Sequence, residues 1–139
     1  MEFPLGGPPY SAASIADLLA WASAHEKTCS AAELSRLEHL ATEVPLEHLA
    51  SLRTDCGRWL YAMHMEAAGR FEEAAEILRL LREKTVGEER ALIMLASARN
   101  LLAAGFAEQV WYPLSEACKS TGSPRTLRNA ARLLASARK

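Results

Sequence analysis

The chain has 139 residues, half of them hydrophobic, and a formal net charge of −1. This length suits one domain, and a composition rich in alanine and leucine but poor in aromatic residues favours helix over strand. No apolar run reaches the ~20 residues that span a bilayer, and an acid with prolines and glycines at the start is atypical of a signal peptide, so we expect a cytoplasmic protein.

The chain begins with a short proline- and glycine-rich segment, after which helical sequence patterns begin. Residues 1–13 are expected to form an N-terminal arm, and 14–139 a helical domain. Helix starts are indicated at Ser14 and Ser30, each followed three residues later by an acid, which is a capping pair. The apolar residues that follow recur at helical spacing and predict a helix hairpin over 14–44.

Two further hairpins are predicted over 54–85 and 88–121, with a short connecting helix before the first of them. Each is divided by an Ala-Ala-Gly sequence that ends at Gly69 or Gly105, thirty-six residues apart. Glycine ends helices because it tolerates the left-handed conformation of the C′ position. Pro113 lies inside the last predicted helix of these hairpins and should bend or break it.

The last predicted helix spans 124–138 and starts with a capping serine before a proline. Residues 1–118 carry ten basic and seventeen acidic side chains, whereas 119–139 carry six basic and no acidic ones. One interpretation is a capping helix with a solvated basic face, and the other is a docking surface for an acidic partner or nucleic acid. The basic side chains that share a narrow arc of the helix are Arg125, Arg128, Arg132 and Lys139.

Aligned on their glycines, the second and third hairpins resemble the tetratricopeptide repeat, a family of antiparallel helix pairs of about thirty-four residues. The matching positions of residues 55–85 are Tyr61, Ala62, Met65, Gly69, Phe71, Ala74, Leu78 and Leu81. Residues 91–121 match less well, because Ser97 replaces a large residue; the positions that fit are Ala98, Leu101, Gly105, Val110, Leu114 and Ala117.

The resemblance implies an all-α, right-handed stack of antiparallel hairpins with a C-terminal capping helix. It also implies a concave groove, lined by the first helix of each pair, that binds a helix or an extended peptide. The lysines and asparagines with which one subset of the family clamps a terminal carboxylate are absent, and an apolar groove suits an amphipathic helix or an extended segment better. The implied groove residues are Trp59, Met63, Glu66, Leu95, Arg99 and Leu102.

No catalytic, cofactor or metal site is expected. The histidines do not pair at ligand spacing, and no phosphate loop or hydrolase motif is present. Three cysteines without CxxC spacing are expected to be reduced, with Cys56 a buried apolar residue. The aromatic pair Trp111 and Tyr112 is interpreted as core beside Pro113, the alternative being an exposed anchor for a partner or a second subunit.

The sequence therefore predicts a non-catalytic module that binds a protein or peptide, as a small chaperone, adaptor or regulatory scaffold. A homodimer is plausible, because incomplete repeat stacks can cover an end by pairing. The alternative is a regulator that contacts nucleic acid through the basic C-terminal helix, which the near-neutral charge and the absence of aromatics among the arginines disfavour.

Overall fold

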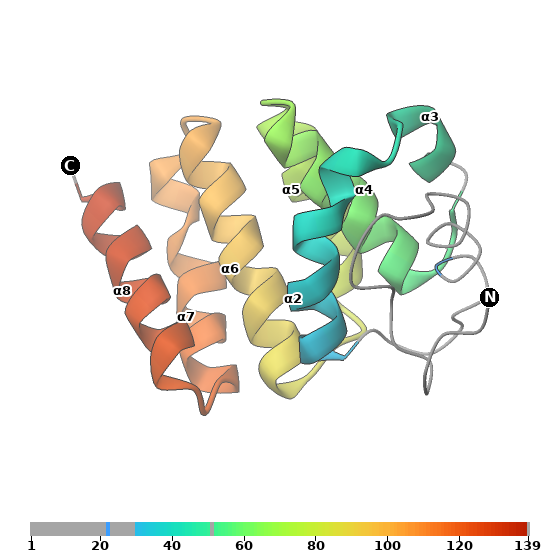
Figure 1. Ribbon diagram of the computed structural model, residues 1–139. Coiled ribbons are helices and arrows are strands. Elements are labelled where there is room, and N and C mark those ends of the chain that lie inside the picture. The colour runs from blue at the N-terminus through green and yellow to red at the C-terminus, as the bar shows by residue number, and fades with distance from the viewer. Residues whose placement is uncertain (1–21, 23–29, 51, 139) are drawn as a thin grey trace.

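The structure is a computed structural model that describes residues 22, 30–50 and 52–138. All regular secondary structure in these ranges is helical (Figure 1), which confirms the all-α prediction for this part of the chain. The predicted arm over 1–13 lies outside the described residues, and so does the first helix of the 14–44 hairpin except for Ala22, which is helical and buried.

The described elements follow the predicted order closely. In chain order they are α2 (Ala31–Leu40), the 3₁₀ turn η2 (Ala41–Glu43), α3 (Leu46–Leu49), α4 (Asp55–Ala67), α5 (Phe71–Arg82), α6 (Gly87–Ala103), the 3₁₀ turn η3 (Ala107–Gln109), α7 (Trp111–Ser120) and α8 (Pro124–Ala137).

Two helix starts are held by serines that the sequence indicated, and a third is held by a threonine. At α2, the Ser30 hydroxyl accepts from the Glu33 amide, and the Glu33 carboxylate accepts from the Ser30 amide, which completes a capping box. Thr54 caps α4 and Ser123 caps α8. Local sequence thus determines where these three helices begin.

Both predicted hairpin turns are present and have the same geometry. Gly69 and Gly105 have φ values of 79° and 93°. The amide after each glycine donates to a carbonyl five residues earlier, from Arg70 to Met65 and from Phe106 to Leu101, at 2.9 Å in both turns. This is the Schellman arrangement, and it reverses the chain so that α4 lies antiparallel to α5, and α6 to α7.

Each helix from α4 to α8 packs against the next one in the chain, and α8 also returns to α6. One departure from a simple run of hairpins involves α2, which packs against both α4 and α6; in Figure 1 it runs beside α6 and in front of α4. Whether the hairpins stack as a tetratricopeptide superhelix stays a prediction.

Two hydrophobic clusters meet at α6. The first joins α2, α3, α4 and α5 to one side of α6, and the second joins α7 and α8 to another side. Helix α6 is therefore buried on several faces, as expected for a helix without a strong apolar stripe. Its buried residues are Ala91, Ile93, Met94, Leu95, Ala96, Ser97, Ala98 and Asn100.

The aromatic pair next to Pro113 differs from its predicted core position. The helix is interrupted, as predicted, and α7 starts at Trp111, so Pro113 falls in a first turn, where its missing amide costs no helical bond. Trp111 and Tyr112 are 53% and 54% exposed, so the core interpretation is wrong. Arginines lie over both rings, Arg138 over Trp111 and Arg82 over Tyr112.

The cysteines also differ from expectation. Cys56 is buried, as predicted, but it is disulfide-bonded, whereas Cys118 is exposed with a free thiol. The prediction of three reduced thiols is therefore wrong at Cys56. Disulfides are rare in a reducing cytoplasm, so the cytoplasmic prediction loses the support that the cysteines had given it.

Candidate functional site

The predicted groove residues lie together on α4 and α6, but most of them are covered. Trp59, Met63 and Leu95 are only 2%, 4% and 5% exposed. Helix α2 buries Leu34, Leu37 and Leu40, and these leucines share a cluster with Trp59 and Met63. The leucine stripe of α2 needs an apolar partner, and the facing sides of α4 and α6 supply it. Leu102 is half-buried against the second cluster.

A tryptophan hydrogen bond fixes the position of α2. The indole Nε1–H of Trp59 donates to the carbonyl oxygen of Leu34 at 2.8 Å, and this bond is buried. Because a buried indole needs an acceptor, this contact fixes how α2 lies along α4. We call the surface formed by α4 and α6 under α2 the α2-covered surface.

An ion-pair network borders the α2-covered surface. The guanidinium of Arg99 donates two hydrogen bonds to Glu66, one of them from Nη2 at 2.7 Å, and Nη2 also lies 3.4 Å from Glu38 Oε1 of α2. Burial alone lowers the pKa of Arg99, but its hydrogen bond to Glu66 and the charges of Glu66 and Glu38 raise that pKa above the ordinary arginine value. Two of the predicted groove residues, Glu66 and Arg99, are thus paired with each other.

Beside α2 lies an open groove of about 560 Å³. Helix α2 forms one wall, α8 forms the other, and α6 forms the floor; we call it the α2–α8 groove. It follows α6 from Glu88 to Arg99, about 16 Å at 1.5 Å per residue. The lining residues are Ala31, Ala32, Ser35, Glu38, His39, Trp59, Glu88, Leu92, Leu95, Arg99, Ser123, Arg125, Thr126 and Asn129.

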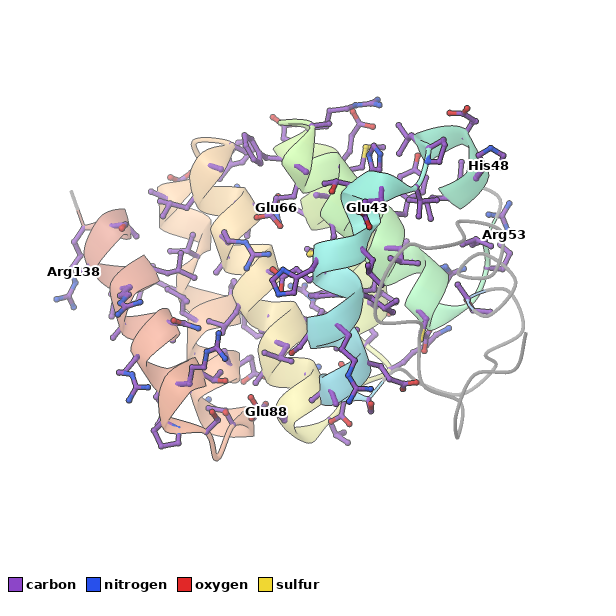
Figure 2. All side chains as sticks on the ribbon, viewed as in Figure 1. Glu43, His48, Arg53, Glu66, Glu88 and Arg138 are labelled. Atoms are coloured by element: carbon purple, nitrogen blue, oxygen red, sulfur yellow. The ribbon has the colours of Figure 1, made fainter. Side chains whose placement is uncertain are left out.

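The α2–α8 groove is more polar than the sequence predicted. Its apolar lining residues are two alanines of α2, Trp59 of α4, and Leu92 and Leu95 of the floor. Both of its carboxylates have protein partners: Glu38 pairs with Arg99, and Glu88 accepts hydrogen bonds from Thr121 and Thr126. In Figure 2, Glu66 and Glu88 lie near opposite ends of α6. The predicted groove is therefore divided: Met63 lies under α2, whereas Trp59, Leu95 and Arg99 also line the accessible groove, which has mixed chemistry.

The predicted basic face lies along the outer side of α8. Arg125 lines the groove, and Arg128 and Arg132 continue along the helix at i+3 and i+7; all three are exposed. Among the described residues, no carboxylate forms an ion pair with any of the three. Arg138 lies away from the groove, near Trp111 (Figure 2). Lys139, the fourth predicted residue, lies outside the described residues.

Two features of the site were missed from the sequence. The hydrogen bonds from Thr121 and Thr126 to Glu88 tie the start of α8 to the start of α6, and no spacing signal links residues so far apart. The position of α2 was also missed. Its capping box and leucine spacing indicated a helix, but nothing local specified which helices it would cover.

The described residues also bear on two other kinds of site. In this part of the chain, no group of three or more His, Cys, Asp or Glu side chains is placed to hold a metal ion. None of the helices in the described ranges combines the length and hydropathy needed to cross a membrane.

Comparison with known proteins gives no relative. No protein-family model, no curated protein and no solved structure matches this chain. The function has to be inferred from the surfaces of the molecule itself.

Proposed function

We propose that this protein is a non-catalytic interaction module of the tetratricopeptide kind that binds a helical or extended segment of another protein in the α2–α8 groove. In this proposal the hairpins form a right-handed stack, and α8 closes its end. The module acts as an adaptor, small chaperone or regulatory scaffold.

The observation that supports this proposal most directly is the open groove beside a surface that already holds a helix. Helix α2 lies on α4 and α6 with buried leucines, a tryptophan hydrogen bond and an ion pair. The next surface, between α2 and α8 on the same central helix, has no such cover among the described residues. Helix-in-groove binding uses this combination of a partly apolar floor and polar edges.

The test compares the capture of a partner by the wild-type protein with capture by a variant in which a large side chain fills the groove. Ser35 is exposed on the α2 wall, so Ser35→Trp places an indole in the groove without disturbing the core. Ser115→Trp is the matched control, because Ser115 is also an exposed helical serine but lies on α7, outside the groove. Tagged full-length proteins are purified from the source cells, and bound proteins are identified by mass spectrometry.

A protein that is captured in stoichiometric amount by the wild type and by Ser115→Trp, but lost with Ser35→Trp, supports the proposal. Circular dichroism and thermal unfolding establish that both variants are folded. The proposal fails if all three proteins capture the same partner equally. It also fails if no protein is captured and a small molecule is bound tightly instead.

A further inference from the structure

We infer that a second groove, between α5 and α7, binds an extended segment of a partner protein that carries a basic residue at one end and an acidic residue at the other. The basic residue pairs with Glu72 and the acidic residue with Arg82. This inference goes beyond the proposed function, because it concerns a different groove and specifies the chemistry of its occupant.

The second groove lies on the side of α6 that faces away from the α2–α8 groove. It has a volume of about 360 Å³, and α5 and α7 form its walls. Ser97 and Leu101 of α6 line its floor. At 3.6 residues per turn, these two residues lie roughly opposite Leu92, which lines the α2–α8 groove. The two grooves therefore use opposite faces of one central helix. We call the second one the α5–α7 groove.

Four charged side chains line the α5–α7 groove, and only two of them are paired. Glu76 and Arg79 form an ion pair at 2.7 Å. Among the described residues, neither Glu72 nor Arg82 has an ion-pair partner. The four charges sum to zero, so the groove as a whole favours neither an acidic nor a basic occupant. Its two unpaired charges favour an occupant that carries one charge of each sign.

The two unpaired charges lie at opposite ends of one wall. Glu72 is in the first turn of α5 and Arg82 is its last residue, which places them about 15 Å apart along the helix at 1.5 Å per residue. The guanidinium of Arg82 lies over the ring of Tyr112 on the α7 wall, 5.2 Å from its centroid. A free amino acid is too short to reach both charges. The occupant is therefore a segment of several residues.

Neutral polar groups between the two ends favour an extended segment over a helix. Ser97 is buried, and its hydroxyl has no hydrogen-bond partner in the described part of the chain. Gln109 and Tyr112 add an amide and a hydroxyl to the lining. An extended chain has free backbone N–H and C=O groups that need such partners, whereas a helix pairs most of its own internally.

The spacing of the charges defines a sequence pattern for the occupant. Residues i, i+2 and i+4 of an extended chain share one face, and i and i+4 are about 13 Å apart. Long charged side chains at i and i+4 can therefore reach both Glu72 and Arg82. The residue at i+2 faces the middle of the groove, where Leu101 and the half-buried Phe106 offer apolar contact. The expected pattern is a base, an apolar residue and an acid at alternate positions, in either chain direction.

A uniformly acidic occupant, including nucleic acid, is disfavoured by the carboxylates on the same wall. Glu72 and Glu76 both line the α5–α7 groove. Glu73 and Glu83 are exposed on the same helix. A polyanion that reached Arg82 would lie along these acids and be repelled by them.

The experiment measures the binding of four labelled ten-residue peptides by fluorescence anisotropy. All have leucine at the central position and differ at the two flanking ones, which hold lysine and glutamate, two lysines, two glutamates or two glutamines. The proteins are the full-length wild type, Glu72→Lys, Arg82→Glu and the double variant. Glu47→Lys is the matched control, because Glu47 is also an exposed acid in the first turn of a helix but lies outside the groove.

The wild type is expected to bind the lysine–glutamate peptide about threefold to tenfold more tightly than the glutamine peptide, because partly exposed ion pairs each contribute little. Glu72→Lys should prefer the peptide with two glutamates, and Arg82→Glu the peptide with two lysines. The double variant, in which the two charges are exchanged, should prefer the lysine–glutamate peptide again. Glu47→Lys and the α2–α8 groove variant Ser35→Trp should bind like the wild type.

Several results would overturn the inference. It fails if the wild type binds all four peptides equally or binds none of them. It fails if Glu72→Lys and Glu47→Lys behave alike, because Glu72 then does not contact the peptide. Since Arg82→Glu also removes a contact with Tyr112, circular dichroism checks its folding. Glu72→Lys, which loses no ion pair, decides the question if Arg82→Glu is unfolded.

The failure of this inference and that of the proposed function are distinguishable. If Ser35→Trp abolishes the binding of the lysine–glutamate peptide, the peptide occupies the α2–α8 groove, and the inference about the α5–α7 groove is wrong. Capture of a cellular partner by the wild type, Ser35→Trp and Ser115→Trp tests the proposed function whatever the four peptides do.

Discussion

The two flanks of helix α6 differ in whether another helix covers them. On one flank, α2 lies over α4 and α6, and Arg99, which also lines one end of the α2–α8 groove, is paired with Glu66 and Glu38. On the other flank the α2–α8 groove is open, and Arg125 lines it without a carboxylate partner in the described part of the chain. The contrast separates two uses of similar residues. Arginine and leucine form contacts within the fold on the covered flank, whereas Arg125 on the open flank has no carboxylate partner among the described residues.

The largest effect on stability is expected from a substitution in α2, which tests whether this helix is a stable part of the covered flank. Leu37 is fully buried, so Leu37→Ala removes buried methyl groups and leaves a cavity, which should cost about 2–5 kcal/mol of unfolding free energy. Urea unfolding monitored by circular dichroism measures it. Leu127→Ala, the same change at a residue 43% exposed on α8, is the control and should cost well under half as much. Equal, small losses would show that α2 does not hold the covered flank.

A smaller effect is expected from the ion pair on the covered flank. Arg99→Met keeps the bulk of the side chain but removes its hydrogen bonds to Glu66. It should lower the unfolding free energy by about 1–2 kcal/mol, because partial solvent exposure weakens hydrogen bonds between charged groups. A double-mutant cycle with Glu66→Gln isolates the pair. A coupling free energy near zero would contradict the assignment of Arg99 to the fold.

The pH dependence of Arg99 has a defined sign. Because the pKa of Arg99 is raised in the folded protein, the stability that its charge contributes is fully present below the unfolded pKa. It is lost only as the pH rises through the folded pKa, at strongly alkaline pH. The cost of Arg99→Met should therefore not change when unfolding is repeated at mildly acidic and mildly alkaline pH, and a cost that falls between these conditions would assign the effect to another group.

The smallest effect on stability is expected on the open flank. Replacing Arg125, Arg128 and Arg132 with glutamine should change the unfolding free energy by no more than about 0.5 kcal/mol, with a slight gain because like charges at i, i+3 and i+4 are removed. Thermal and urea unfolding of the triple variant measure this. A loss above about 1 kcal/mol would favour the other interpretation of this helix, in which its basic face serves only to cap the fold.

Some of the site could be predicted locally. The capping serines, the glycines at positive φ and the proline before Arg125 specify where α2, α8 and the hairpin turns begin and end, because these effects act within a few residues. The exposure of Arg125, Arg128 and Arg132 also followed from their common arc on one helix. The exposure of Trp111 could not be predicted in this way, because it depends on the residue at which the helix containing Pro113 begins.

By itself, the sequence determined that the described chain is helical, where its hairpins turn, and that its basic charge gathers on the last helix. Helical spacing, caps and glycine conformations are properties of neighbouring residues, so they can be read along the chain. Only the tertiary structure decided that α2 covers Trp59 and Met63 and leaves the α2–α8 groove open. The position of α2 depends on which apolar faces from distant parts of the chain pack together. The hydrophobic effect is non-directional, so a local sequence pattern does not specify which face an apolar stripe will cover.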